Sequence, residues 1–130
     1  MLSRIHHIAI ICSDYEKSKR FYTEILGLNI IRETFRAERQ SYKLDLELNG
    51  TYVIELFSFP NPPKRPSRPE AVGLRHLAFE VDNLEASIDK LKSFGIEVEP
   101  IRIDELTNQR FTFFADPDDL PLELYERRQE

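Results

Sequence analysis

Residues His7–Leu28, HIAIICSDYEKSKRFYTEILGL, decide the fold because the chain repeats their pattern in residues His76–Val98, HLAFEVDNLEASIDKLKSFGIEV. The two copies align histidine with histidine, His7 with His76, and the second copy is then one residue shorter. Further identical residues then align in one register: Asp14 with Asp82, Gly27 with Gly95, and Glu55 with Glu123. A repeat of this length predicts two copies of one structural module.

Each copy is expected to begin with a strand, near residues 4–12 and 73–81, where apolar, β-branched and aromatic residues dominate. A helix follows. Its start is predicted from the spacing of a capping box, in which a side-chain oxygen and a carboxylate three residues later bind the free amides of the first turn. These boxes are Ser13 with Glu16 and Asp82 with Glu85, and each helix should end at a glycine, Gly27 or Gly95.

Three further strands are expected in each copy, at about 28–36, 41–48 and 51–58, and at about 96–102, 109–115 and 120–126. The module is therefore βαβββ. Asn49-Gly50 indicates a tight hairpin because both positions accept positive φ. We expect one α+β domain over residues 1–128, with modules at about 4–58 and 73–126 paired into a curved mixed sheet, and a proline-rich linker at 59–72.

Composition excludes several classes of protein. The net charge is -5, from 23 acidic and 18 basic residues spread along the chain, which argues against a nucleic-acid binder. The basic patch Lys64, Arg65 and Arg68 lies in the proline-rich segment and is interpreted as a solvated loop. No apolar run can span a bilayer, and the sole cysteine, Cys12, favours a reducing cytoplasm.

Four polar side chains interrupt apolar strands at repeat-equivalent positions: His7, Glu55, His76 and Glu123. Any one of them alone is more typical of a structural histidine or a solvent-facing glutamate. Two buried carboxylates without a cation would each cost several kcal/mol, on the order of the desolvation penalty of an ion, whereas a divalent metal would neutralise both. The pattern therefore predicts one shared metal site.

Two imidazoles and two carboxylates suit Zn²⁺, Ni²⁺, Co²⁺ or Mn²⁺, and octahedral coordination would leave two positions for water or substrate. Such a site can polarise a carbonyl and stabilise an enediolate, with one of the glutamates serving as base. Strand alternation places His6 on the opposite face from His7, so His6 is interpreted as structural and its replacement by alanine should leave metal content unchanged.

The segments HHIAIICSDYEKSKRFYTEILGL, YVIELFSFP, GLRHLAFEVDNL and FFADPDDLPLELYE resemble, in order, the signature segments of the vicinal oxygen chelate superfamily, glyoxalase I-like branch. VIELFSFPNPPKRPSRPEAVGLRHLAF is similar to the YaeR-like subgroup of small stand-alone bacterial proteins. The resemblance implies the glyoxalase fold, places His7, Glu55, His76 and Glu123 at the metal-ligand positions, and places Glu123 at that of the catalytic base.

Three positions depart from the glyoxalase I pattern. Ile11 stands where an arginine binds a glutathione carboxylate, and Phe59 stands where an asparagine is usual, so lactoylglutathione is a doubtful substrate. Asp119 replaces the glycine of a DPDG turn, and because aspartate tolerates left-handed geometry the turn should persist.

The functional hypothesis is a metal-dependent lyase or isomerase that acts on a small oxygenated metabolite or thiol adduct through a metal-stabilised enediolate, with Glu123 and Glu55 as catalytic residues. The alternatives are a metal-dependent epimerase, a non-catalytic small-molecule binding protein and an iron dioxygenase of the same superfamily. A homodimer is expected, with each metal held within one chain or shared between two, because an isolated module would leave sheet surface and strand edges uncovered.

Overall fold

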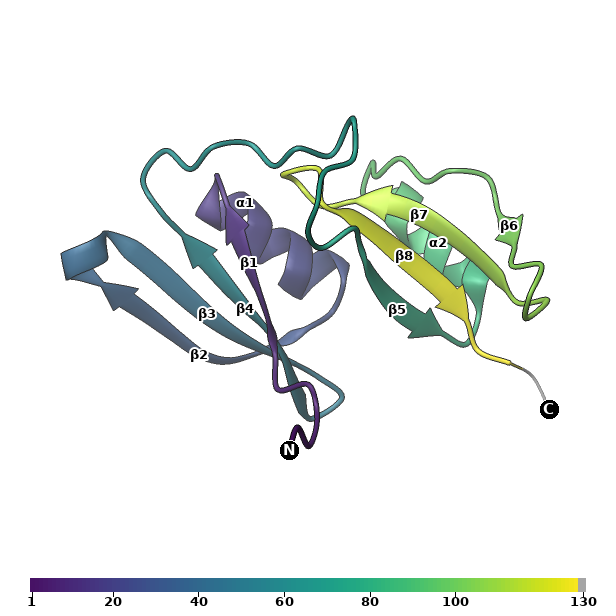
Figure 1. Ribbon diagram of the computed structural model, residues 1–130, viewed down its shortest axis with the longest axis horizontal. Helices are drawn as coiled ribbons and strands as arrows, with labels where there is room; N and C mark the ends of the chain where they lie inside the picture. Colours follow the sequence, from purple (N-terminus) through teal and green to yellow (C-terminus); the bar gives the residue numbers. More distant parts are fainter. Residues whose placement is uncertain (129–130) are drawn as a thin grey trace. The chain divides into compact units, whose positions relative to one another are not determined.

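The computed structural model describes residues 1–128 of the 130. The chain divides into two compact units, unit 1 (Met1–Lys64) and unit 2 (Arg65–Glu130). Each unit contains one strand, one helical segment and three further strands, in that order (Figure 1). The predicted α+β class and the βαβββ module are therefore confirmed.

Unit 1 forms one four-stranded mixed sheet in the order β1-β4-β3-β2. The edge strand β1 pairs with β4 in parallel, and the other two pairs are antiparallel. The elements are β1 (Ile8–Cys12), α1 (Tyr15–Arg20), a π-helical turn (Phe21–Ile25), β2 (Asn29–Arg36), a 3₁₀ turn (Ala37–Arg39), β3 (Ser41–Leu48) and β4 (Thr51–Ser58).

Unit 2 repeats this topology in the order β5-β8-β7-β6, with β5 and β8 parallel. Its elements are β5 (Leu77–Val81), α2 (Leu84–Ser93), β6 (Arg102–Ile103), β7 (Arg110–Ala115) and β8 (Pro121–Glu126). The prediction of a strand at 96–102 is wrong, because only the two residues of β6 pair with β7. Pro100 has no amide hydrogen, and before it only the Glu99 amide reaches β7, at the Phe113 carbonyl (3.1 Å).

Both helices begin one residue later than the capping boxes predict. Asp14, not Ser13, caps α1 by accepting a hydrogen bond from the Lys17 amide (3.2 Å). Asn83, not Asp82, caps α2 through the Ala86 amide (3.0 Å). Each cap directly precedes a buried first helical residue, so packing selects the start. The predicted glycine ends are confirmed, with φ of 81° at Gly27 and 77° at Gly95.

The core of each unit lies between its sheet and its helix: α1 packs against β4, and α2 packs against β8 (Figure 1). The largest fully buried side chains include Tyr22, Leu44, Leu46, Ile54, Leu56, Leu84 and Leu122. The predicted turns are confirmed by positive φ at Asn49 (50°), Gly50 (83°) and Asp119 (67°). Among residues 1–128, no helix is both long and apolar enough to cross a membrane.

Candidate metal centre

The four predicted ligands fall into two pairs, one in each unit. In unit 1, His7 immediately precedes β1 and its Nε2 lies 3.4 Å from Oε1 of Glu55 on the neighbouring strand β4. In unit 2, His76 immediately precedes β5 and its Nε2 lies 3.2 Å from Oε1 of Glu123 on β8. The same two atoms therefore meet in both copies of the module.

Strand register explains this repeated geometry. Ala9 pairs with Glu55 across β1 and β4, and Ala78 pairs with Glu123 across β5 and β8. In each case the histidine two residues earlier lies beside the carboxylate, and alanine leaves room on that face. Glu55 is 9% exposed and Glu123 is 8% exposed, so both carboxylates are buried as expected.

The spacing within each pair fits two ligands of one metal ion. Two donors at right angles, each about 2.1 Å from a metal, lie about 3 Å apart. Within the described part of the chain, no cluster of three or more His, Cys, Asp or Glu side chains could hold a metal ion. Each unit by itself therefore supplies half of the predicted ligand set.

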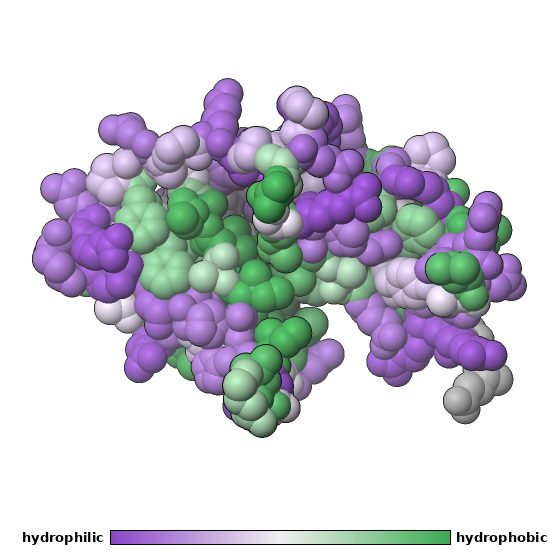
Figure 2. All heavy atoms as spheres, viewed as in Figure 1, coloured by the Kyte–Doolittle hydropathy of each residue, from purple (hydrophilic) through white to green (hydrophobic). Residues whose placement is uncertain are grey.

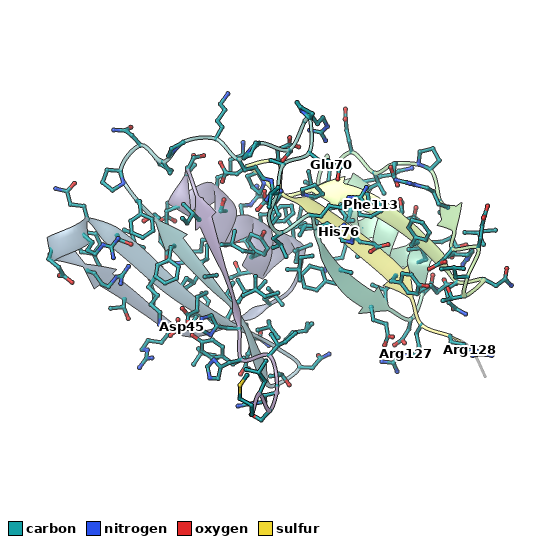
Figure 3. All side chains as sticks on the ribbon, viewed as in Figure 1. Asp45, Glu70, His76, Phe113, Arg127 and Arg128 are labelled. Atoms are coloured by element: carbon teal, nitrogen blue, oxygen red, sulfur yellow. The ribbon has the colours of Figure 1, made fainter. Side chains whose placement is uncertain are left out.

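A polar network surrounds the carboxylate of unit 1. The Tyr52 hydroxyl donates to Glu55 Oε2 (2.6 Å), and Lys43 Nζ lies 3.6 Å from the same oxygen and 3.0 Å from Asp45 Oδ1. Asp45, labelled in Figure 3, is 1% exposed and faces Glu55 directly across β3 and β4. Arg32 also contacts Asp45 Oδ2 (3.3 Å).

This network shifts the ionisation of two of its members. Burial, followed by the hydrogen bond to Glu55, raises the pKa of the Tyr52 hydroxyl above its usual value. Burial opposes ionisation of Asp45, but the hydrogen bonds from Lys43 and Tyr52 and the charge of Lys43 outweigh it, so the pKa of Asp45 is lowered. Tyr52 is thus a neutral hydrogen-bond donor and Asp45 an anion.

Aromatic rings surround the pair of unit 2 instead. The Phe113 ring lies edge-on to His76, with centroids 5.0 Å apart, and both side chains are labelled in Figure 3. Phe113 faces Glu123 across β7 and β8, as Asp45 faces Glu55 in unit 1. Phe111 packs against Phe113 with centroids 6.0 Å apart. The two units therefore present the same donors in opposite surroundings.

His6 is not where strand alternation placed it. Its Nδ1 lies 2.9 Å from Nδ1 of His7, and the two rings meet edge to face at 5.1 Å. Because β1 begins only at Ile8, the period of two does not extend back to residues 6 and 7. His6 thus contacts Nδ1, the ring nitrogen of His7 that does not face Glu55, and the prediction that the two side chains point to opposite faces is wrong.

A cavity of about 1040 Å³ lies within unit 2 and is lined by both His76 and Glu123. Phe111, Phe113 and Phe114 form part of its wall. This volume is at the upper end of typical small-molecule pockets, and the mixture of aromatic and convergent polar groups is usual for them. The cavity can therefore hold a metabolite beside the second His–Glu pair.

The repeat did not reveal Lys43, Asp45 and Tyr52. Asp45 carried a detectable signal, because it is a carboxylate between two apolar residues, Leu44 and Leu46, as Glu55 is between Ile54 and Leu56. The offset of 68 residues that relates Glu55 to Glu123 aligns Asp45 with Phe113, so a search for paired polar residues passes over it.

Comparison with known proteins identifies the family of this chain. Residues 4–124 match the model of the Glyoxalase/Bleomycin resistance protein/Dioxygenase superfamily. The chain is 68% identical over 127 residues to the uncharacterized protein YwkD of Bacillus subtilis, with 98% of this chain and 99% of that protein covered. It is 60% identical over 126 residues to the uncharacterized protein YaeR of Escherichia coli, with 97% and 98% covered.

A solved relative and a named enzyme extend the likeness. The crystal structure of the glyoxalase family protein from Enterococcus faecalis matches with a TM-score of 0.88 and 50% identity, covering 95% of this chain and 97% of that one. A probable lactoylglutathione lyase of Vibrio cholerae is 30% identical over 134 residues, covering 97% and 92%. The chain therefore belongs to the Glyoxalase/Bleomycin resistance protein/Dioxygenase superfamily, and within it to the group that contains YaeR and YwkD.

Proposed function

We propose that His7, Glu55, His76 and Glu123 together hold one divalent metal, and that the chain is a glyoxalase I-like lyase or isomerase acting on a small oxygenated metabolite or thiol adduct. The observation that carries this proposal is the repeated contact of a histidine Nε2 with a buried glutamate Oε1, at 3.4 Å in unit 1 and 3.2 Å in unit 2. The 30% identity to a probable lactoylglutathione lyase supports the reaction class.

The donor set fits a borderline divalent cation such as Zn²⁺, Ni²⁺, Co²⁺ or Mn²⁺. Two carboxylates neutralise its charge, and two imidazoles favour a transition metal over Mg²⁺ or Ca²⁺. A cation held there would polarise a substrate carbonyl and stabilise negative charge on adjacent oxygens. His6, in contact with His7 Nδ1, can hold that ring in one orientation and one tautomer.

The two glutamates are suited to different tasks. Tyr52 donates to Glu55 Oε2, and Lys43 lies beside the same oxygen, so this carboxylate is held in place. Among the described residues, Glu123 forms an ion pair with His76 only, and it faces the uncharged ring of Phe113. We therefore propose that Glu123 takes the proton from a carbon next to the substrate carbonyl, whereas Glu55 remains a fixed ligand.

Assembly as a homodimer also belongs to this proposal, because the strands of unit 1 leave apolar surface uncovered. Unit 1 leaves several large hydrophobic side chains exposed on its strands: Ile11, Ile30, Ile31, Phe35 and Tyr42. The face of unit 1 drawn in Figure 2 also carries hydrophobic (green) surface. Such a surface favours association with another module. Two modules of one chain, or modules of two chains, could complete the site.

Proton exchange with solvent tests this function before the substrate is known. The protein, reconstituted with each of the four metals, is incubated with a pool of hydroxy and keto metabolites in D₂O, and mass spectrometry records which compounds gain deuterium. We expect metal-dependent labelling of one compound class, abolished by Glu123→Gln. Labelling without a change of connectivity would identify an epimerase.

Two results would replace the proposal. Tight ligand binding that persists after chelation, with no deuterium incorporation by any metal form, would identify a small-molecule binding protein. Oxygen consumption by the iron form alone would identify a dioxygenase.

A further inference from the structure

Two of the three basic residues of the linker line the cavity of unit 2. Arg65 and Arg68, which composition alone suggested to be solvated, both line the cavity that also contains His76 and Glu123. Two other arginines, Arg75 and Arg102, line it as well. These four arginines differ in whether a carboxylate already neutralises their charge.

Three of the four arginines have a carboxylate partner within the same lining. Arg68 is paired with Asp119. Arg75 Nε lies 2.5 Å from Glu70 Oε2, and Arg102 Nη2 lies 2.7 Å from Glu99 Oε1. These six charges cancel in pairs.

Arg65 differs from the other three. Its Nε donates to the Ser67 hydroxyl (2.7 Å), and its Nη2 donates to the Leu74 carbonyl (3.1 Å), so both acceptors are uncharged. The Ser67 hydroxyl in turn donates to the Asp119 carbonyl (2.7 Å), which fixes this acceptor in place. Across the described residues, no carboxylate forms an ion pair with Arg65, although its side chain is half-buried.

A half-buried guanidinium without a counter-ion is suited to bind an anion. A guanidinium has five N–H donors, and these two contacts leave the Nη1 donors of Arg65 free. The contacts also restrict the side chain, so little rotamer freedom remains to be lost on binding. Leu74 lies two residues before His76, and Arg65 lines the same cavity as the second His–Glu pair.

The remaining carboxylates of the lining do not satisfy Arg65. Glu97 is exposed to solvent, so its charge is screened. Glu123 contacts His76 and is the proposed metal ligand. The walls contributed by Phe111 and Phe113 suit an apolar body attached to the anionic group.

We propose that Arg65 binds the anionic group, a carboxylate or phosphate, of the small molecule that occupies this cavity. The identification of that molecule as substrate rests on the proposed function, whereas the anion site itself requires no metal. Under the proposed function, Arg65 is the specificity residue that selects acidic metabolites and orients them toward His76 and Glu123.

Titration of the metal-free full-length protein with inorganic phosphate and with acetate, at low ionic strength, tests the site. NMR follows the Arg65 side-chain Nε–H and the backbone amides of residues 65–76. We expect saturable shifts centred on Arg65, and Arg65→Gln should weaken binding about tenfold or more, as expected for a lost charged hydrogen bond. The control Arg68→Gln removes an arginine already paired with Asp119 and should change affinity less than about twofold.

Arg65→Lys separates a specific site from general attraction, because it keeps the charge but loses the guanidinium fork. Affinity between those of wild type and Arg65→Gln is expected. The proposal is overturned if wild type shows no binding up to about 50 mM anion, a limit beyond weak small-ligand affinity. It is also overturned if Arg65→Gln binds as wild type does, or if both glutamine variants lose affinity equally.

Repeating the titration on zinc-loaded protein distinguishes this proposal from the proposed function. If the protein retains no metal but its anion binding depends on Arg65, the proposed anion site stands and the proposed metal centre is wrong. If the protein binds metal but its anion affinity does not depend on Arg65, the metal centre stands and the anion site is wrong. Spectra of the variants that match wild type away from residues 65–76 establish that the fold is intact.

Discussion

The His–Glu pairs of the two units share a geometry but not an environment. Glu55 lies beside Tyr52 and Lys43 and faces a buried Asp45, whereas Glu123 faces Phe113. Backbone register places the His–Glu contact in each unit, and the neighbouring strand determines which side chains face each carboxylate. The comparison indicates that a duplicated module can keep its His–Glu contacts equivalent while its two carboxylates acquire different neighbours.

The largest expected effect comes from removing either carboxylate. Glu55→Gln and Glu123→Gln should each lower Zn²⁺ affinity by on the order of 100-fold or more, above the 10- to 100-fold typical of an outer-sphere partner, because a neutral amide is a poorer ligand. Competition with a chromophoric chelator measures the affinity. Glu80→Gln, which removes an exposed partner of Arg127, is the control. Wild-type affinity in either ligand variant would show that its pair does not bind metal.

Mixing two defective chains tests whether the pairs complement each other between subunits. His7→Ala and His76→Ala chains should each bind no metal. If the site is shared between chains, half of the randomly reassorted dimers are mixed and each has one intact site, so occupancy should return to about a quarter of wild type. Metal analysis after co-refolding gives the value. If metal occupancy does not recover, each chain builds its own site. A monomeric wild-type protein that binds one metal per chain would show the same.

Tyr52→Phe sharpens the contrast between the two carboxylates. Loss of the hydroxyl that donates to Glu55 should lower metal affinity about tenfold, the usual effect of an orienting partner. In a cobalt-substituted protein the visible absorption bands should shift, which a purely structural role would not produce. Tyr125→Phe is the matched control, because that hydroxyl donates to Asp104 (2.9 Å) and not to Glu123. Equal affinities for the two variants would remove the proposed difference between the pairs.

The smallest effect concerns how each unit attaches its helix to its sheet. In unit 1 the Tyr15 hydroxyl donates to Glu33. In unit 2 Glu126 accepts from the Leu84 amide (3.2 Å) and from Arg110 (2.8 Å), and the hydrogen bonds from Arg110 hold the pKa of Glu126 below its usual value. Glu126→Gln should therefore lower the free energy of unfolding by about 1 kcal/mol at pH 7.

The pH dependence follows from the direction of this shift. Because the folded-state pKa of Glu126 is lowered, its stabilisation is fully present above the unfolded pKa of about 4.3 and is lost as pH falls through the folded value. Urea denaturation at several pH values should show the difference between wild type and Glu126→Gln shrinking below about pH 4. Glu24→Gln, in an exposed pair with Arg20, should change stability by less than about 0.5 kcal/mol. A difference independent of pH would exclude the ionised carboxylate as its cause.

Particular residues show where prediction from the sequence succeeded and failed. The glycines that end the helices, the Asn49-Gly50 hairpin and the Asp119 turn were predicted because local backbone preference decides them. The predicted helix caps were wrong by one residue, because Ser13 and Asp14 are both good caps and only the packing of Tyr15 determines which one is used. His6 was misplaced because nothing local marks the residue at which strand alternation begins.

The sequence by itself determined the repeated module, its strand and helix order, and the equivalence of the histidine and glutamate in each copy, because these depend on periodicity and on turn residues. Only the tertiary structure decided what surrounds each pair. Asp45 and Glu55 are ten residues apart in the chain and meet only through the β3–β4 register, and Arg65 lines one cavity with His76 and Glu123 only because the tertiary fold of unit 2 brings them together. Contacts of this kind depend on burial and strand pairing, which bring together side chains that no local pattern relates.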